Sequence, residues 1–188
     1  MRVSELKLKG VLLVEPVYFE DYRGYYSETY SKRTLAQYGI IDDFVQDNHI
    51  LTLKEGTLRA IHFQNQPKAQ SKLVRCTRGV VFDVAVDLRK NSPTYKMWVS
   101  TILSHENRKQ IYIPKGFGHG FITLCDNSEV QYKVDELYEP KLDRSIAWND
   151  PEINIKWPIS NPILSEKDMT APNLCNSDVN YCFEGGEL

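Results

Sequence analysis

The sequence predicts an all-β protein, a sandwich or barrel built from many short strands. From Phe44 onward, short apolar segments alternate with turns rich in glycine, proline and asparagine, spaced roughly ten residues apart. Residues 80–88 alternate strictly between two faces, as half-buried strands do. The first half of the chain contains one convincing helix, so the pattern does not indicate β-α-β units.

Before Phe44 the pattern predicts, in order, a strand, a turn, an aromatic-rich extended segment and a helix, at 6–15, 21–24, 25–30 and 32–38. Ser31 is a suitable N-cap for this helix because its hydroxyl can accept a hydrogen bond from a free backbone N–H. Gly39 is a suitable stop, since glycine tolerates the left-handed conformation that ends many helices.

The remaining strands are predicted at 44–53, 58–64, 72–77, 80–88, 97–103, 110–113, 120–125 and 129–137. After residue 140 the chain is expected to pack irregularly across the outside of the core, with a short turn at 165–168. Residues 173–188 are polar and are expected to form a loosely held C-terminal tail. No repeat or linker divides the sequence, so a single domain spanning 1–188 is predicted.

Composition narrows the possible functions. The 188 residues are 41% hydrophobic and 26% charged, and a formal net charge of −2 disfavours nucleic acid or an anionic membrane as a partner. No apolar segment approaches the ~20 residues of a membrane span. The N-terminus lacks a signal-peptide core, so a cytoplasmic location is expected. There the four cysteines are expected to be reduced thiols: Cys76, Cys125, Cys175 and Cys182.

A histidine near two cations is the first candidate for chemistry. His62 lies in an apolar strand with Arg59, and Lys72 opens the next strand. A neutral imidazole accepts protons well near neutral pH, best when a carboxylate orients it, and Asp83 and Asp168 are candidates for that carboxylate. Either cation could bind phosphate or stabilise an oxyanion.

Tyr132 is a possible proton donor that would complete this set. A base, an acid and a cation suit proton abstraction next to a carbonyl. Taken singly, each residue is better explained by packing or solvation, and spacing alone does not show that they converge. The face of strand 80–88 that carries Asp83 and Asp87 has two similar interpretations, a solvated surface or the lining of a polar cavity inside a barrel.

Two segments resemble the double motif of the cupin barrel, Gly56-x5-His62-x-Gln64 and Pro114-x-Gly116-x2-His119. In metal-binding cupins, imidazole, carboxylate and amide ligands stand where this chain has Gln64, Lys68 and Thr123. A transition metal needs three or four imidazole or carboxylate ligands, and two remain. The resemblance therefore implies a jelly-roll barrel and chemistry without a metal or other cofactor. No Gly-x-Gly-x-x-Gly segment suggests a dinucleotide cofactor.

Longer stretches make the resemblance specific. The sequence resembles the nucleotide-sugar 3,5-epimerase family typified by dTDP-4-dehydrorhamnose 3,5-epimerase, from about Asp21 to Asp168. The matching stretches are 44–49 (FVQDNH), 59–64 (RAIHFQ), 70–74 (QSKLV), 81–89 (VFDVAVDLR), 92–94 (SPT), 113–121 (IPKGFGHGF), 148–151 (WNDP) and 165–168 (SEKD). The family implies a cofactor-free, homodimeric jelly-roll enzyme that converts dTDP-4-dehydro-6-deoxy-D-glucose to dTDP-4-dehydro-L-rhamnose.

The resemblance also implies catalytic roles. His62 would be the base and Asp168 its carboxylate partner. Tyr132 would be the acid on the opposite face of the sugar ring, and Lys72 would stabilise the developing enolate at O4.

Further residues would bind the substrate. His119 and Asp83 would form a second polar pair in the cavity. Arg59 and the segment from Gln46 to Asn48 would hold the diphosphate and the nucleotide. Arg23 and Glu28 would reach the nucleotide of the neighbouring subunit.

One position departs from the family pattern, which has glycine where this chain has Ala60. Strict strand alternation would place Ala60 and His62 on one face and Arg59 on the other. If Arg59 and His62 both reach the substrate, the strand must bulge, and the extra methyl could narrow the cavity. Three alternatives stay open: an epimerase that inverts only C3 or only C5 or uses another nucleotide or sugar, a non-catalytic sugar-nucleotide-binding cupin, and a metal-dependent cupin oxygenase or isomerase.

Overall fold

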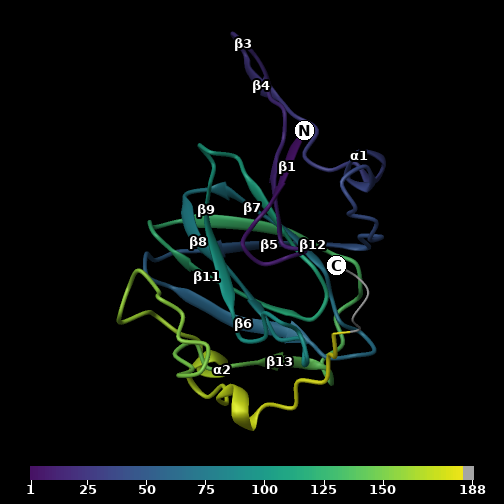
Figure 1. Ribbon diagram of the computed structural model, residues 1–188. Helices are drawn as coiled ribbons and strands as arrows, with labels where there is room; N and C mark the ends of the chain where they lie inside the picture. Colours follow the sequence, from purple (N-terminus) through teal and green to yellow (C-terminus); the bar gives the residue numbers. More distant parts are fainter. Residues whose placement is uncertain (184–188) are drawn as a thin grey trace.

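The computed structural model describes residues 1–183, which form two antiparallel sheets packed face to face as a jelly roll (Figure 1). The six-stranded sheet has the order β1 (Arg2–Glu5), β2 (Leu12–Glu15), β10 (Gln110–Ile113), β7 (Lys72–Arg78), β12 (Ser128–Val134), β5 (Gln46–Thr52). The five-stranded sheet has the order β13 (Asp143–Ser145), β6 (Leu58–Gln64), β11 (Phe117–Thr123), β8 (Val80–Asp87), β9 (Trp98–Ser104). The predicted all-β class is confirmed.

The N-terminal region differs most from the prediction. The expected strand at 6–15 is replaced by β1 and β2, which pair with each other because the chain reverses near Gly10, whose φ of +88° is in the left-handed region. β3 (Phe19–Asp21) and β4 (Gly24–Tyr26) form a second hairpin that projects away from both large sheets (Figure 1).

Short helices flank the sheets. The predicted N-cap is confirmed, because Ser31 Oγ accepts a hydrogen bond from the Thr34 N–H at the start of α1 (Lys32–Ala36). A second helix, α2 (Glu166–Met169), stands where a short turn was predicted, and a 3-10 helix follows at η1 (Leu174–Asn176). Figure 1 places α2 beside β13, at the end of the molecule opposite the projecting hairpin.

The alternation of β8 divides its side chains between the interior and an outer layer. Val81 and Ala85 join the apolar core between the two sheets, while Val84 and Val86 pack under the C-terminal segment with Ile153, Leu174 and other apolar residues. Asp83 points to the inter-sheet side with Val81 and Ala85, and it is completely buried. The polar-interior interpretation of this face is therefore correct for Asp83.

The interior has an apolar half and a polar half. The apolar half is filled by side chains such as Leu103 of β9, Ile111 of β10 and Phe117 of β11. The polar half lies toward β12 and β5 in one sheet and toward β6 and β13 in the other, where histidine, lysine and tyrosine side chains replace the aliphatic ones.

The C-terminal segment is attached more firmly than expected, as far as residue 183. Val179 is buried, and the Asn180 side-chain amide accepts a hydrogen bond from the Gln66 N–H and donates one to the Gln66 carbonyl. The Phe183 N–H donates to the Lys90 carbonyl at 2.8 Å. The part of the predicted tail at 184–188 lies outside the described residues. None of the helices in 1–183 is long and apolar enough to cross a membrane.

Candidate active site

A bulge in β6 brings the first two candidate residues to the same face. His62 is paired with His119 of β11, but Arg59 is paired with Phe121, so three steps along β6 match two steps along β11. The extra residue lets both Arg59 and His62 face the interior, which strict alternation forbids. The bulge predicted from the sequence is confirmed.

Ala60 lies on the outer side of this bulge, which corrects the sequence-based expectation. It is completely buried in the outer apolar layer with Leu58 and Ile61. Its nearest neighbour across the sheet is Gly120, where an added Cβ would lie 3.0 Å from the Ala60 Cα and Cβ. The Ala60 methyl therefore points away from His62, and the expectation that it narrows the cavity is wrong.

His62 is paired with a carboxylate that arrives from a distant part of the chain. Its Nε2 lies 2.6 Å from Asp168 Oδ1, across 106 residues of sequence. Asp168 is almost completely buried in α2, whereas the His62 side chain keeps 33% of its exposure. With Nε2–H donated to the carboxylate, Nδ1 carries the lone pair of the neutral ring. The predicted pairing of these two residues is present.

A second His–Asp pair lies deeper in the interior. His119 Nε2 is 3.1 Å from Asp83 Oδ1 and 3.0 Å from Oδ2, and both side chains are buried. Burial lowers the pKa of His119, and the Asp83 carboxylate opposes this shift without cancelling it. The His119 ring is therefore neutral near pH 7 and donates its Nε2–H to Asp83.

Lys72 connects the two sheets inside the polar half. From β7 its Nζ donates to the His62 carbonyl at 3.4 Å and lies 6.0 Å from the centre of the Tyr132 ring. Burial lowers the pKa of Lys72 to about 8, although Asp143 and Asp83 pull it upward. A desolvated ammonium of this kind interacts strongly with an anion that enters the cavity.

Tyr132 faces the same space from β12. Burial raises the pKa of its phenol, so the hydroxyl keeps its proton at neutral pH, and the nearby Arg59 guanidinium partly offsets that rise. Asn48 is the cross-strand partner of Tyr132 on β5, and Gln46 Nε2 donates to Asn48 Oδ1 at 2.8 Å. Arg59 Nε, from β6, donates to Thr52 Oγ1 of β5 at 3.4 Å. Three predicted binding residues, Gln46, Asn48 and Arg59, thus border Tyr132.

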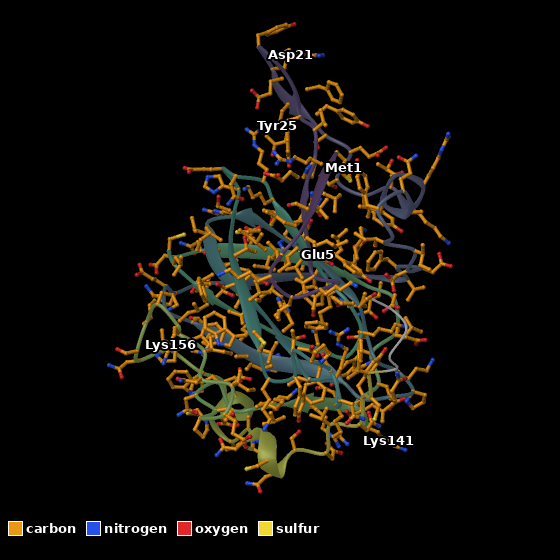
Figure 2. The ribbon with its side chains drawn as sticks, viewed as in Figure 1. Met1, Glu5, Asp21, Tyr25, Lys141 and Lys156 are labelled. Carbon is orange, nitrogen blue, oxygen red and sulfur yellow. The ribbon has the colours of Figure 1, made fainter. Side chains whose placement is uncertain are left out.

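Arg23 is not brought to this site within one chain, whereas Glu28 lines a cavity together with Asn48 and Tyr132. Arg23 lies on the projecting hairpin, where its guanidinium binds Asp21 at 2.5 Å. Figure 2 labels Asp21 and Tyr25 on this hairpin, far from the sheet that carries β6. Glu28 follows the hairpin and accepts a hydrogen bond from Thr34. The predicted contact of these two residues with the nucleotide of a neighbouring subunit stays a prediction.

Asp143 was missed by the sequence analysis. It lies on β13 opposite Gln64 of β6, and its Oδ2 accepts hydrogen bonds from Lys167 at 2.5 Å and Tyr138 at 3.1 Å. Its charge raises the pKa of Lys72, although burial has the larger effect there. A strand of three residues shows no periodicity, so the sequence contained no signal for its placement.

Gln64, at the position of a metal ligand in the cupin motif, has a structural role here. Its Nε2 donates to the Lys68 carbonyl at 2.6 Å, and its Oε1 accepts from the Glu139 N–H at 2.7 Å. These bonds join the loop after β6 to the loop before β13. Within residues 1–183 no group of three or more histidine, cysteine, aspartate or glutamate side chains could hold a metal ion.

Comparison with known proteins identifies relatives along most of the chain. A sequence profile described as dTDP-4-dehydrorhamnose 3,5-epimerase matches residues 5–176. A protein of that name from Salmonella typhimurium is 48% identical over 176 residues, covering 93% of this chain and 96% of the relative. The crystal structure of a Legionella pneumophila dTDP-6-deoxy-D-glucose-3,5-epimerase in complex with dTDP-4-keto-L-rhamnose superposes with a TM-score of 0.92 at 39% identity, covering 97% of this chain and 98% of that one.

A more distant solved structure differs in its described reaction. It is a 3'-monoepimerase from Streptomyces bikiniensis in complex with dTDP-quinovose, with a TM-score of 0.84 and 32% identity, covering 90% of this chain and 86% of that one. The match to the profile spans far more than half of the sequence, and the relatives are covered almost end to end. The chain therefore belongs to the dTDP-4-dehydrorhamnose 3,5-epimerase family.

Proposed function

We propose that this protein epimerises dTDP-4-dehydro-6-deoxy-D-glucose at C3 and C5 to give dTDP-4-dehydro-L-rhamnose, without a cofactor. One observation carries the assignment of roles. His62 and Tyr132 come from the two facing sheets, and the buried Lys72 ammonium contacts the His62 backbone and the Tyr132 ring. A sugar ring between the sheets would thus meet a base on one face, an acid on the other and a cation beside them.

The chemistry follows from the ketone at C4. This carbonyl acidifies the C–H bonds at both C3 and C5. His62 Nδ1 would take one of these protons while the C–H electron pair forms the enolate, whose oxygen Lys72 would stabilise. Tyr132 would then return a proton to the same carbon from the opposite face, which inverts the centre. His62 and Tyr132 recover their original protonation states by exchange with water.

The two carboxylates of the site would have different roles. Asp168 holds the His62 ring and would stabilise the imidazolium that forms after proton transfer. Burial keeps His119 neutral although the Asp83 carboxylate opposes this, so the ring would not compete as a cation. Its one N–H is donated to Asp83, and its Nδ1 could accept a hydrogen bond from the substrate. Arg59 would bind the substrate diphosphate, since a guanidinium matches phosphate geometry.

Deuterium exchange tests this function. In D2O with dTDP-4-dehydro-6-deoxy-D-glucose, NMR should show deuterium entering both C3 and C5 in the wild-type protein, and His62→Ala should abolish exchange at both. Exchange at one carbon only would establish the monoepimerase alternative, which the Streptomyces bikiniensis relative makes specific. If the wild-type protein exchanges no deuterium, the result would favour a protein that binds the sugar nucleotide without catalysis. If a chelator removes the activity and a divalent metal restores it, the result would support the metal-dependent alternative.

We also propose that the active protein is a homodimer whose projecting hairpins reach the neighbouring subunit. The hairpin exposes large aromatic side chains, with Tyr22 96% exposed and Tyr26 70% exposed. Arg23 lies in the turn of this hairpin, between β3 and β4, where it pairs with Asp21. Exposed aromatic groups on a projecting arm suit burial against a second copy.

Subunit complementation tests the proposed dimer. Co-expressed His62→Ala and Arg23→Ala chains form mixed dimers in which one site combines an intact His62 with the intact arm of the other chain. With random pairing, about half of the dimers are mixed, and one of the two sites in each mixed dimer is complete. The activity of the mixture should therefore recover to about a quarter of the wild-type activity, although each variant alone is inactive or weak. No recovery in isolated mixed dimers would show that Arg23 acts within its own chain.

We further propose that the protein is located in the cytoplasm. The described cysteines are free thiols, which supports this location.

A further inference from the structure

The N-cap of α2 also binds the carboxylate that faces His62. Ser165 Oγ accepts a hydrogen bond from the Asp168 N–H at 3.2 Å, which is the usual N-cap contact. The same hydroxyl donates to Asp168 Oδ2 at 2.8 Å. The other carboxylate oxygen, Oδ1, meets His62 Nε2 at 2.6 Å. Serine, aspartate and histidine therefore form one continuous chain of hydrogen bonds.

This arrangement differs from an ordinary capping box. There, the acidic side chain three residues after the N-cap turns back to the N-cap backbone N–H. In α2 the Asp168 carboxylate binds the Ser165 hydroxyl and the His62 ring. A hydroxyl has one donor and two acceptor sites, so Ser165 can cap the helix and bind the carboxylate at once.

We propose that Ser165 is a positioning residue for the epimerase reaction, because its hydroxyl fixes the Asp168 carboxylate with Oδ1 toward His62. The inference rests on the proposed function of His62 as the base. Asp168 is almost completely buried in a helix of four residues, and its carboxylate oxygens are held by His62 at Oδ1 and by Ser165 at Oδ2. Without the Ser165 donor, the carboxylate can rotate and the His62 ring loses its fixed orientation.

The hydroxyl also acts on the charge of the pair. A hydrogen bond donated to a carboxylate disperses part of its negative charge. Removal of the Ser165 donor should leave more of this charge facing the His62 ring, which favours a proton on that ring. The acidic limb of the activity profile should therefore move to higher pH, because catalysis requires a neutral His62.

The other charged groups near this pair do not depend on Ser165. Lys72 and the neutral His119 face His62 from β7 and β11, and Asp143 and Asp83 act on Lys72. Lys167, the next residue to Asp168, binds Asp143. None of these groups contacts Ser165 Oγ, whose hydrogen bonds are both to Asp168.

Three substitutions at Ser165 separate the two hydrogen bonds. Ser165→Ala and Ser165→Gly both remove the donor, but glycine is a much better N-cap than alanine. Ser165→Thr keeps the donor and the cap, and the exposed position leaves room for the added methyl. Thr170→Val is the matched control, since it removes the Thr170 Oγ1 bond to the Glu166 carbonyl at the other end of α2 without touching Asp168.

We expect alanine and glycine to lower kcat equally, by about three- to tenfold, with KM unchanged. The acidic limb of kcat/KM should move to higher pH in both variants and return to its wild-type position in Ser165→Thr. Thr170→Val should behave as wild type. In ¹H NMR, the downfield N–H resonance of the His62 ring should shift in the alanine and glycine variants.

Three results would overturn the inference. Full kcat in Ser165→Gly with a loss in Ser165→Ala would reduce Ser165 to a helix cap. An activity loss that follows the folded fraction, with no displacement of the pH limb, would have the same meaning. An unshifted His62 resonance would show that the hydroxyl does not act on the pair. If the wild type itself exchanges no deuterium, the proposed function fails, while the resonance still tests the hydrogen-bond chain.

Discussion

The two His–Asp pairs of this protein are neighbours in space and differ in almost every physical respect. His62 and His119 are directly paired residues of β6 and β11. The His119–Asp83 pair is built within the five-stranded sheet and is buried on both sides. The His62–Asp168 pair joins a sheet strand to a late helix, and its imidazole keeps a third of its exposure. The first pair suits a fixed, neutral part of the cavity wall, and the second suits proton transfer.

The source of each carboxylate explains this difference. Asp83 is held by seven cross-strand pairs between β8 and β11, so it cannot move without disturbing the sheet. Asp168 is held by a short helix and its cap, which lie on the outside of the barrel. A carboxylate attached in this second way can be tuned by local residues without altering the core. If this comparison is correct, substitutions in the two pairs should damage different properties.

The largest expected effect is on activity in the exposed pair. His62→Ala should abolish detectable deuterium exchange, a loss of roughly 10³-fold, because general-base catalysis typically contributes about 10²- to 10⁴-fold. Thermal unfolding should show little change, since Asp168 keeps its bond to Ser165 and the site is partly solvated. Exchange assays and calorimetry on the same preparation measure both quantities. A large loss of stability would show that the two pairs do not divide their roles in this way.

The next largest effect is on stability in the buried pair. His119→Ala should lower the free energy of unfolding by about 3 kcal/mol, because it leaves the completely buried Asp83 carboxylate without its partner. Denaturant titration measures this change. The double variant His119→Ala/Asp83→Ala should regain part of the loss, since no uncompensated charge remains. Equal stability of the single and double variants would contradict this account.

Lys72 contacts the exposed pair through the His62 carbonyl and lies close to the buried pair. Changing the pH distinguishes its charged ammonium from its neutral amine. With a pKa of about 8, its ammonium loses its proton as pH rises through 8, so kcat/KM should fall above that pH if the cation stabilises the enolate. Lys72→Arg should remove this basic limb because arginine stays charged. A limb that persists in Lys72→Arg would have to come from another group.

The same pKa predicts the direction of a stability change. The folded-state pKa of Lys72 lies below its ordinary value of 10.5, so between pH 8 and pH 10.5 the unfolded chain binds the proton more tightly than the folded one. The contribution of Lys72 therefore destabilises the folded state at neutral pH, and this penalty disappears as pH rises through that window. Lys72→Met should raise the thermal midpoint at pH 7 while lowering activity, and should have less effect on stability at pH 10.5.

The sequence predicted the strands better than the connections between them. Period-two alternation located β8 and grouped Asp83 with Val81 and Ala85 on one face, because side-chain direction in a strand depends on local geometry alone. It left open whether that face was solvated or lined a polar cavity. The pairing of His62 with Asp168 spans 106 residues and came from a family resemblance, since no local pattern reports so distant a contact. Asp143 had neither source of information, because β13 is too short for alternation.

The smallest expected effect concerns Ala60, the residue that the sequence analysis interpreted incorrectly. Strict alternation placed its methyl beside His62, but the bulge turns it into the outer layer against Gly120. Ala60→Gly should therefore leave the ratio of C3 to C5 exchange unchanged. It should cost about 1 kcal/mol of stability, because glycine loses more conformational freedom on folding and buries no methyl. Exchange NMR and denaturant titration measure the two effects. Since the bulge both separates Ala60 from the cavity and brings Arg59 beside His62, a changed exchange ratio would mean that the bulge itself had shifted, and Arg59 would then move with it.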